Sequence, residues 1–168
     1  GKSMMGLEPK NLARLAEKYF PDVIGYGANC GIGASELIGT MICLANEREN
    51  EDMLLIAKGN CGIPEFIEGK IAYTGTPELM AEYANFARAI GVDIIGGFCG
   101  TKYEHIMAIR NALLNKNQSK NIDINEITQS LGEMSAGNKA LIDIYLNPNK
   151  KKKPFVKKKT RRRRKKSD

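Results

Sequence analysis

The chain has 168 residues, of which 42% are hydrophobic, so its length and composition suit a folded domain rather than a disordered segment. No apolar run approaches the roughly 18 residues of a membrane-spanning helix, and the N-terminus lacks a secretory-signal pattern. We therefore expect a cytoplasmic protein that makes no membrane contact, with its four cysteines reduced.

The net charge of +7 is concentrated at one end of the chain. Thirteen Lys and Arg residues lie within 150–166, and without them and Asp168 the remainder holds 13 basic and 18 acidic residues. Residues 148–168 are therefore predicted to form a disordered, Lys/Arg-rich tail. Such a run is typical of a solvated appendage; weak binding of nucleic acid or another polyanion is the alternative.

The first part of the chain alternates between helix and strand patterns. Apolar residues have helical spacing from Glu8 to Tyr19, and a buried strand is predicted from Val23 to Cys30. Ser35 is a candidate cap for a second helix over Glu36 to Glu47. This helix is expected to bury four apolar side chains: Leu37, Ile38, Met41 and Leu44.

The same order then repeats. Met53 to Lys58 is an apolar run of strand length, followed by a predicted loop containing Pro64 and Gly69. A helix is predicted to begin at Thr76-Pro77 and to end near Ile90. The remaining predictions are a strand over 92–97, a helix over 103–114 and one or two short helices within 122–146. This alternation predicts an α/β fold with a parallel sheet, either doubly wound or closed into a barrel.

Three cysteines share one position relative to the predicted strands. Cys30, Cys61 and Cys99 each lie at a strand end and directly before a glycine. Parallel strands about 4.8 Å apart bring their carboxyl ends to one edge, where three thiolates could hold a catalytic zinc with one open position. The alternative is that these cysteines are small buried residues without a common role. Cys43, in the middle of a helix, is predicted to belong to the core.

Several segments resemble the homocysteine S-methyltransferase family. Residues 96–106 (GGFCGTKYEHI) are similar to its GGCCGTxPEHI signature, and residues 27–31 (GANCG) resemble its GxNC strand end. Residues 60–64 (NCGIP) and 76–83 fall where the family has NAGxP and a helix opening. Residues 4–9 (MMGLEP) resemble bacterial betaine-dependent members of the family.

The resemblance implies a (β/α)8 TIM-type barrel, of which this chain would supply the C-terminal part. Residues 1–115 would be a partial homocysteine-binding barrel domain with strands six to eight and their helices. A barrel of this class takes about 250 residues, and the chain begins with Gly1, so we expect upstream residues to be missing. Residues 116–147 are expected to form a short helical extension, followed by the basic tail at 148–168.

The activity that the resemblance implies is zinc-dependent transfer of a methyl group to the thiol of homocysteine, forming methionine, with betaine as the expected donor. Homocysteine and this small donor would be its partners, and Asn29 and Gly31 are predicted to contact substrate. Homo-oligomerisation of the full-length protein stays open. The alternative is an inactive or incomplete barrel fragment whose tail binds a polyanion.

The resemblance also implies the zinc ligands, and one of them is absent. Cys30 and Cys99 match family ligands, but Phe98 occupies the third position and cannot bind zinc. Cys61 could supply the third thiolate, tight zinc binding could be lost, or Phe98 could be a sequence error, since Cys and Phe codons differ by one base. His105, the only histidine, is expected to have a structural role at a helix start.

Overall fold

The computed structural model describes residue 3, residues 5–115 and residues 120–147, together with the backbone but not the side chain of Cys30. The predicted basic tail lies outside the described residues. In chain order the elements are α1 (Pro9–Glu17), β1 (Gly25–Cys30), α2 (Ala34–Asn46), β2 (Leu54–Gly59), β3 (Pro64–Ile67), β4 (Lys70–Tyr73), α3 (Pro77–Ile90), β5 (Ile94–Gly97), α4 (Tyr103–Leu114), α5 (Ile124–Leu131) and α6 (Ala136–Leu146).

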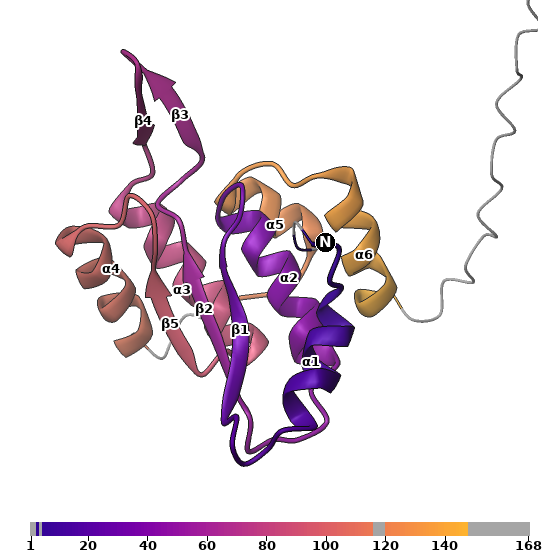
Figure 1. The fold of residues 1–168 in the computed structure, drawn as a ribbon. Coiled ribbons are helices and arrows are strands. Elements are labelled where there is room, and N and C mark those ends of the chain that lie inside the picture. Colours follow the sequence, from indigo (N-terminus) through magenta and orange to yellow (C-terminus); the bar gives the residue numbers. More distant parts are fainter. Residues whose placement is uncertain (1–2, 4, 116–119, 148–168) are drawn as a thin grey trace, which may run out of the picture.

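A three-stranded parallel sheet lies at the centre of the fold, with the strand order β1-β2-β5 (Figure 1). Cys30 at the end of β1 pairs with Gly59, and Gly59 pairs with Gly97 at the end of β5. The three strands therefore end together, at what we call the carboxyl edge of the sheet. The α/β class and the parallel sheet are confirmed, and the arrangement is compatible with part of a barrel.

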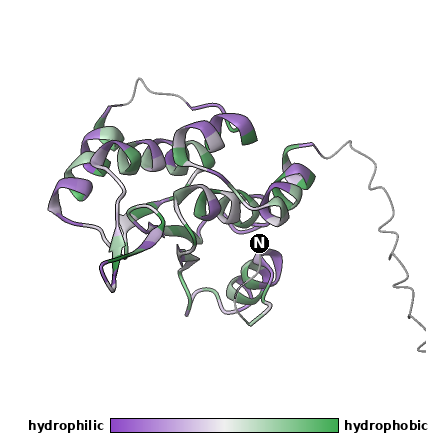
Figure 2. Ribbon diagram, turned by 90° about the horizontal axis from the view of Figure 1, so that it is seen from above, coloured by the Kyte–Doolittle hydropathy of each residue, from purple (hydrophilic) through white to green (hydrophobic). Residues whose placement is uncertain are grey.

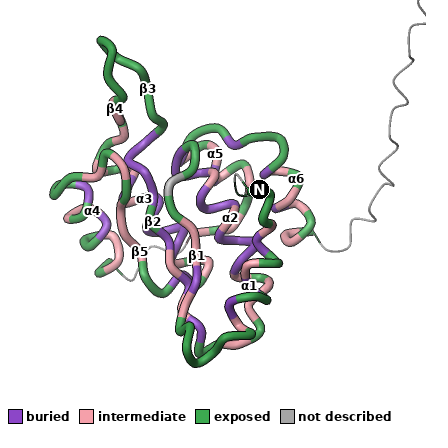
Figure 3. Tube along the Cα trace, in the orientation of Figure 1, coloured by how far each residue is buried: buried purple, intermediate pink, exposed green. Residues whose placement is uncertain are grey.

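Buried residues alternate with less buried ones along β2, and the burial classes along the whole trace are shown in Figure 3. Leu55 and Ala57 of β2 are fully buried in the core that the helices complete. On the opposite face Lys58 is exposed, and the side chain of Ile94 is 47% exposed. Because side chains alternate along a strand, one face packs against helices while the other stays open among the described residues.

Helix α2 contributes more buried residues than any other described helix. The prediction for its start was wrong, because Gly33, with φ +123°, is the cap and Ser35 lies inside the helix. The Ser35 hydroxyl instead donates to the carbonyl of Glu133, 2.9 Å away and 98 residues along the chain. The buried residues include the four predicted ones: Leu37, Ile38, Met41 and Leu44.

The segment predicted as a loop after β2 forms an antiparallel hairpin, β3–β4. Its turn residues Glu68 and Gly69 both have positive φ, 49° and 79°, as a two-residue type I′ turn requires. The hairpin projects away from the sheet (Figure 1), and its strands are largely exposed, with Phe66 at 78%.

Helices α3 and α4 begin and end close to the predicted positions. Thr76 is the cap of α3, and its hydroxyl accepts a hydrogen bond from the Leu79 N–H at 3.2 Å. Gly91, in the left-handed conformation, ends the same helix. Hydrophilic and hydrophobic residues mix along the helices (Figure 2), as expected for helices with one face toward a core. No helix in the described part of the chain has the length and apolarity needed to cross a membrane.

One or two short helices were predicted within 122–146, and two are present, α5 and α6. Helix α6 packs against α2. The amide of Asn138 donates to the main-chain carbonyl of Glu36 at 2.9 Å and to its carboxylate at 2.8 Å. Gly39 makes this approach feasible, because a Cβ there would lie 2.5 Å from the Asn138 amide nitrogen. Residues 136–146 are therefore part of the packed body.

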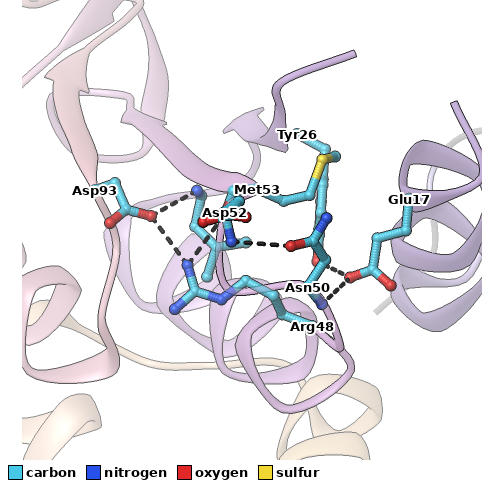
Figure 4. Close-up of polar contacts among 8 residues, drawn as sticks. Glu17, Tyr26, Arg48, Asn50, Asp52, Met53 and Asp93 are labelled. Carbon is cyan, nitrogen blue, oxygen red and sulfur yellow. Dashed lines mark hydrogen bonds and ion pairs between the residues drawn. The ribbon is translucent and has the colours of Figure 1, made fainter. Parts of the chain in front are cut away.

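Charged side chains connect the elements at the opposite end of the sheet, the amino edge (Figure 4). The Asp93 carboxylate accepts hydrogen bonds from the Arg48 guanidinium at 3.0 Å and from the Leu55 N–H at 2.8 Å. The Glu17 carboxylate accepts from the N–H groups of Glu49 and Asn50, at 2.9 and 3.4 Å. These bonds join α1, the loop after α2, β2 and the start of β5.

Candidate functional site

The side chain of Asn60 connects two loops at the carboxyl edge. It follows β2 directly and is only 1% exposed. Its amide group donates to the carbonyl of Gly31 at 3.0 Å, and its carbonyl oxygen accepts from the N–H of Cys99 at 3.2 Å. We call these two bonds the Asn60 bridge. It joins the turn after Cys30 to the turn that carries Cys99.

Backbone hydrogen bonds join the Cys99 turn to the loop after β2. The N–H of Phe98 donates to Gly59 at 2.7 Å, and the N–H of Cys61 donates to the carbonyl of Cys99 at 2.9 Å. The turn also needs Gly100, which has φ +73° and whose Cβ would lie 2.3 Å from the Cβ of Tyr73. Both the N–H and the C=O of Cys99 are thus paired with the 60–61 segment.

The thiol of Cys61 belongs to a buried hydrogen-bond chain. The Lys102 N–H donates to Nδ1 of His105 at 2.9 Å, so a neutral ring carries its proton on Nε2. This Nε2 lies 3.2 Å from the Cys61 sulfur, which in turn donates to the carbonyl of Gly75 at 3.0 Å. Each polar group in this hydrogen-bonded series is paired, as buried polar groups need to be.

The environment of Cys61 favours the neutral thiol. The residue is fully buried, and this burial raises the pKa of its thiol, with a further contribution from the carboxylate of Glu104. To bind a metal, the sulfur would have to exchange its contacts with Gly75 and His105. His105 is 5% exposed and caps the start of α4, in agreement with the structural role expected for it.

The other predicted site residues lie around the end of β1. Asn29 is exposed and pairs in register with Lys58 of β2. Gly31 is exposed, with φ +82°, and its carbonyl accepts a hydrogen bond from the Asn60 amide. The backbone of Cys30 ends the strand between these two residues, while its side chain lies outside the described atoms. The structure therefore places Gly31 and Cys99 on either side of Asn60.

An aromatic side chain occupies the position where the family resemblance requires a third cysteine. Phe98 is 41% exposed, and the Lys58 ammonium lies 5.6 Å from the centre of its ring, within range of a cation–π contact. From the sequence, Lys58 has no predicted role, and Asn60 can be interpreted either as a residue that caps a turn or as one that orients ligands or substrate. The available signal for Asn60 was its place directly after a buried strand.

Sulfur atoms are the donors best suited to a metal at this edge. Among the described side chains, which do not include that of Cys30, no group of three His, Cys, Asp or Glu residues is close enough to hold an ion. Cys61, Cys99 and His105 therefore form no such group. Thiolates from Cys30 and Cys99 are of the type that zinc prefers, so the donor set fits this metal in its chemistry.

A model of the homocysteine S-methyltransferase family matches residues 1–113. The matched segment contains all three parallel strands, the Asn60 bridge and all the predicted site residues. It ends within the last turn of α4, so α5 and α6 lie beyond it.

Proposed function

Because the chain belongs to the homocysteine S-methyltransferase family, we propose that it transfers a methyl group to the sulfur of homocysteine, which gives methionine. The observation that carries this proposal is that the family match spans the loops of Cys30 and Cys99, which the Asn60 bridge joins at one edge of the sheet. Active sites of parallel α/β folds lie at this edge.

We further propose that Cys30 and Cys99 hold a zinc ion together with a third ligand. Cys61 is our candidate for this position, since its backbone is hydrogen-bonded to Cys99, although its sulfur would have to leave Gly75 and His105. Bound there, zinc would lower the pKa of the homocysteine thiol and keep it as a nucleophilic thiolate.

The residues of the edge would position the two substrates. The exposed Asn29 and Gly31 lie beside the Cys30 position and would contact homocysteine. With betaine as donor, the substrate sulfur forms a bond to a methyl carbon while the methyl–nitrogen bond breaks. The electron pair of that bond stays on nitrogen, so betaine leaves as dimethylglycine. The thiol proton is released to solvent when the thiolate forms, and the dimethylglycine nitrogen can take up a proton after the transfer, so the product is methionine with a neutral sulfur.

The proposal is tested by replacing one ligand and one matched core cysteine. We expect Cys99→Ala to lose methionine formation from homocysteine and betaine by at least about 100-fold, because one of few ligands is removed. Cys43→Ala, which truncates a fully buried helix residue, should keep wild-type turnover. Zinc content, measured by atomic absorption on the same preparations, tests the metal independently of turnover.

Two further results decide the finer parts of the proposal. Equal zinc content in the wild type and in Cys61→Ala would exclude Cys61 as a ligand. Methionine formation with S-methylmethionine or a methylfolate, but not with betaine, would show that betaine is not the methyl donor. Wild-type turnover and zinc content in Cys99→Ala would overturn the proposed site altogether.

A further inference from the structure

The turn after Cys30 and the turn that carries Cys99 do not follow neighbouring strands. β2 lies between β1 and β5, so strand pairing alone places the two turns about two strand spacings, roughly 10 Å, apart. No ladder bond can join them directly. The Asn60 side chain crosses this interval, with bonds of 3.0 Å to Gly31 and 3.2 Å to Cys99.

Burial makes this connection stiff. Asn60 is 1% exposed, and a buried amide that loses its hydrogen-bond partners is left with the full cost of its desolvation. A change in the separation of the turns would stretch at least one of its bonds, and solvent has little access to a side chain of this exposure to replace the lost bond. The Cys99 turn is fixed further by the bond from the Cys61 N–H to the Cys99 carbonyl.

We infer that Asn60 is a positioning residue that holds the backbone of Gly31, next to Cys30, at a fixed distance from the backbone of Cys99, and thereby sets the affinity of the edge for zinc. Its neutral amide reaches both turns without adding a negative charge beside two thiolates. The inference rests on the proposed zinc site, but the spacing of the thiols can be measured without any metal.

The experiment compares Asn60→Ala with Asn138→Ala in the full chain. Asn138 is a matched control, because it is also a buried asparagine whose amide bridges two elements, here α6 and Glu36 of α2. Zinc affinity is measured by competition with a chromophoric chelator. Phenylarsine oxide, which forms two As–S bonds with a pair of nearby thiols and releases water, reports on the thiol pair in metal-free protein; Cys30→Ala identifies the pair.

We expect Asn60→Ala to bind both zinc and the arsenical about tenfold more weakly or worse, as for residues that orient metal ligands. Asn138→Ala should lose thermal stability to a similar extent but keep both affinities. Asn60→Leu keeps the volume and the neutral charge of the side chain but removes both hydrogen bonds, so it should also weaken arsenical binding, and it decides the matter if the alanine variant does not fold.

The outcomes separate this inference from the proposed function. Wild-type affinities in both Asn60 variants would overturn the inference and leave the zinc site standing. If the wild type binds no zinc, the proposed metal site fails, and the arsenical alone decides whether Asn60 sets the thiol spacing. Failure of the wild type to bind the arsenical, or binding that survives in Cys30→Ala, would also overturn the inference.

Discussion

The two edges of the same sheet are built from different chemistry. At the amino edge, charged groups make the connections: Asp93 pairs with Arg48, and Glu17 accepts from backbone N–H groups (Figure 4). At the carboxyl edge, the connections are made by the amide of Asn60 and the imidazole of His105. The amino edge joins elements and offers no thiol, whereas the carboxyl edge joins the cysteine-bearing turns.

The difference follows from what each edge has to accommodate. Partly exposed ion pairs are tolerant of small shifts and contribute modestly to stability. A carboxylate beside Cys30 and Cys99 would repel the thiolates that a metal needs, whereas the amide of Asn60 does not. We therefore expect substitutions at the amino edge to change stability, and substitutions at the carboxyl edge to change metal and thiol chemistry.

The largest effect is expected from Phe98→Cys. It places a third sulfur where the family has one, and we expect zinc affinity to rise by about 100-fold, or about 2.7 kcal/mol. Phe98 is 41% exposed, so the free energy of unfolding should change little. Chelator competition measures the affinity. Phe66→Cys on the exposed hairpin is the matched control, and an equal gain in both variants would contradict the assignment of this edge.

A smaller effect is expected from Asp93→Ala at the amino edge. It removes the partner of Arg48 and leaves the Leu55 N–H without its acceptor, so the free energy of unfolding should fall by about 1–2 kcal/mol. Urea denaturation measures this loss. Asp93→Asn, which keeps an acceptor oxygen, should lose less. Zinc affinity should not change. A variant Asp93→Ala with wild-type stability but altered zinc affinity would contradict the expectation that the amino edge affects stability and not metal binding.

The smallest effect concerns alkaline pH. Burial, with a contribution from Glu17, raises the pKa of Tyr26 from 10.0 to about 12, despite an opposing contribution from Arg48. The folded state therefore keeps a proton on Tyr26 that the unfolded chain releases above pH 10. The contribution of Tyr26 to the free energy of unfolding is therefore fully present below pH 10 and is lost as pH rises toward 12. Tyr26→Phe should flatten this fall in urea titrations between pH 9 and 11 while leaving pH 7 stability nearly unchanged. An unchanged slope would contradict this account.

Much of the fold could be predicted because the signals were local. The apolar run before Lys58 and the Thr76-Pro77 pair predicted β2 and the start of α3 to within one residue. The β3–β4 hairpin was missed because its turn is Glu68-Gly69 rather than the usual Asn-Gly or Asp-Gly. Ser35 was misassigned as a cap because its actual partner, Glu133, lies far along the chain.

The site was predictable in its position but not in its connections. The spacing of Cys30, Cys61 and Cys99 after three strands indicated the carboxyl edge. It could not indicate that the Cys61 sulfur meets His105, because that contact spans 44 residues and depends on how α4 packs. The role of Asn60 was hidden for the same reason, since its partners belong to the turns after β1 and β5.

The packing of α6 on α2 has a practical consequence for truncation. A fragment cut at residue 113, where the family match ends, would lack Asn138 and would expose the surface of α2 around Gly39, against which Asn138 packs. The Glu36 carbonyl and carboxylate would lose their amide partner at the same time. Expression fragments should therefore extend through Leu146, or aggregation of the shortened chain would be mistaken for a defect of residues 1–113 themselves.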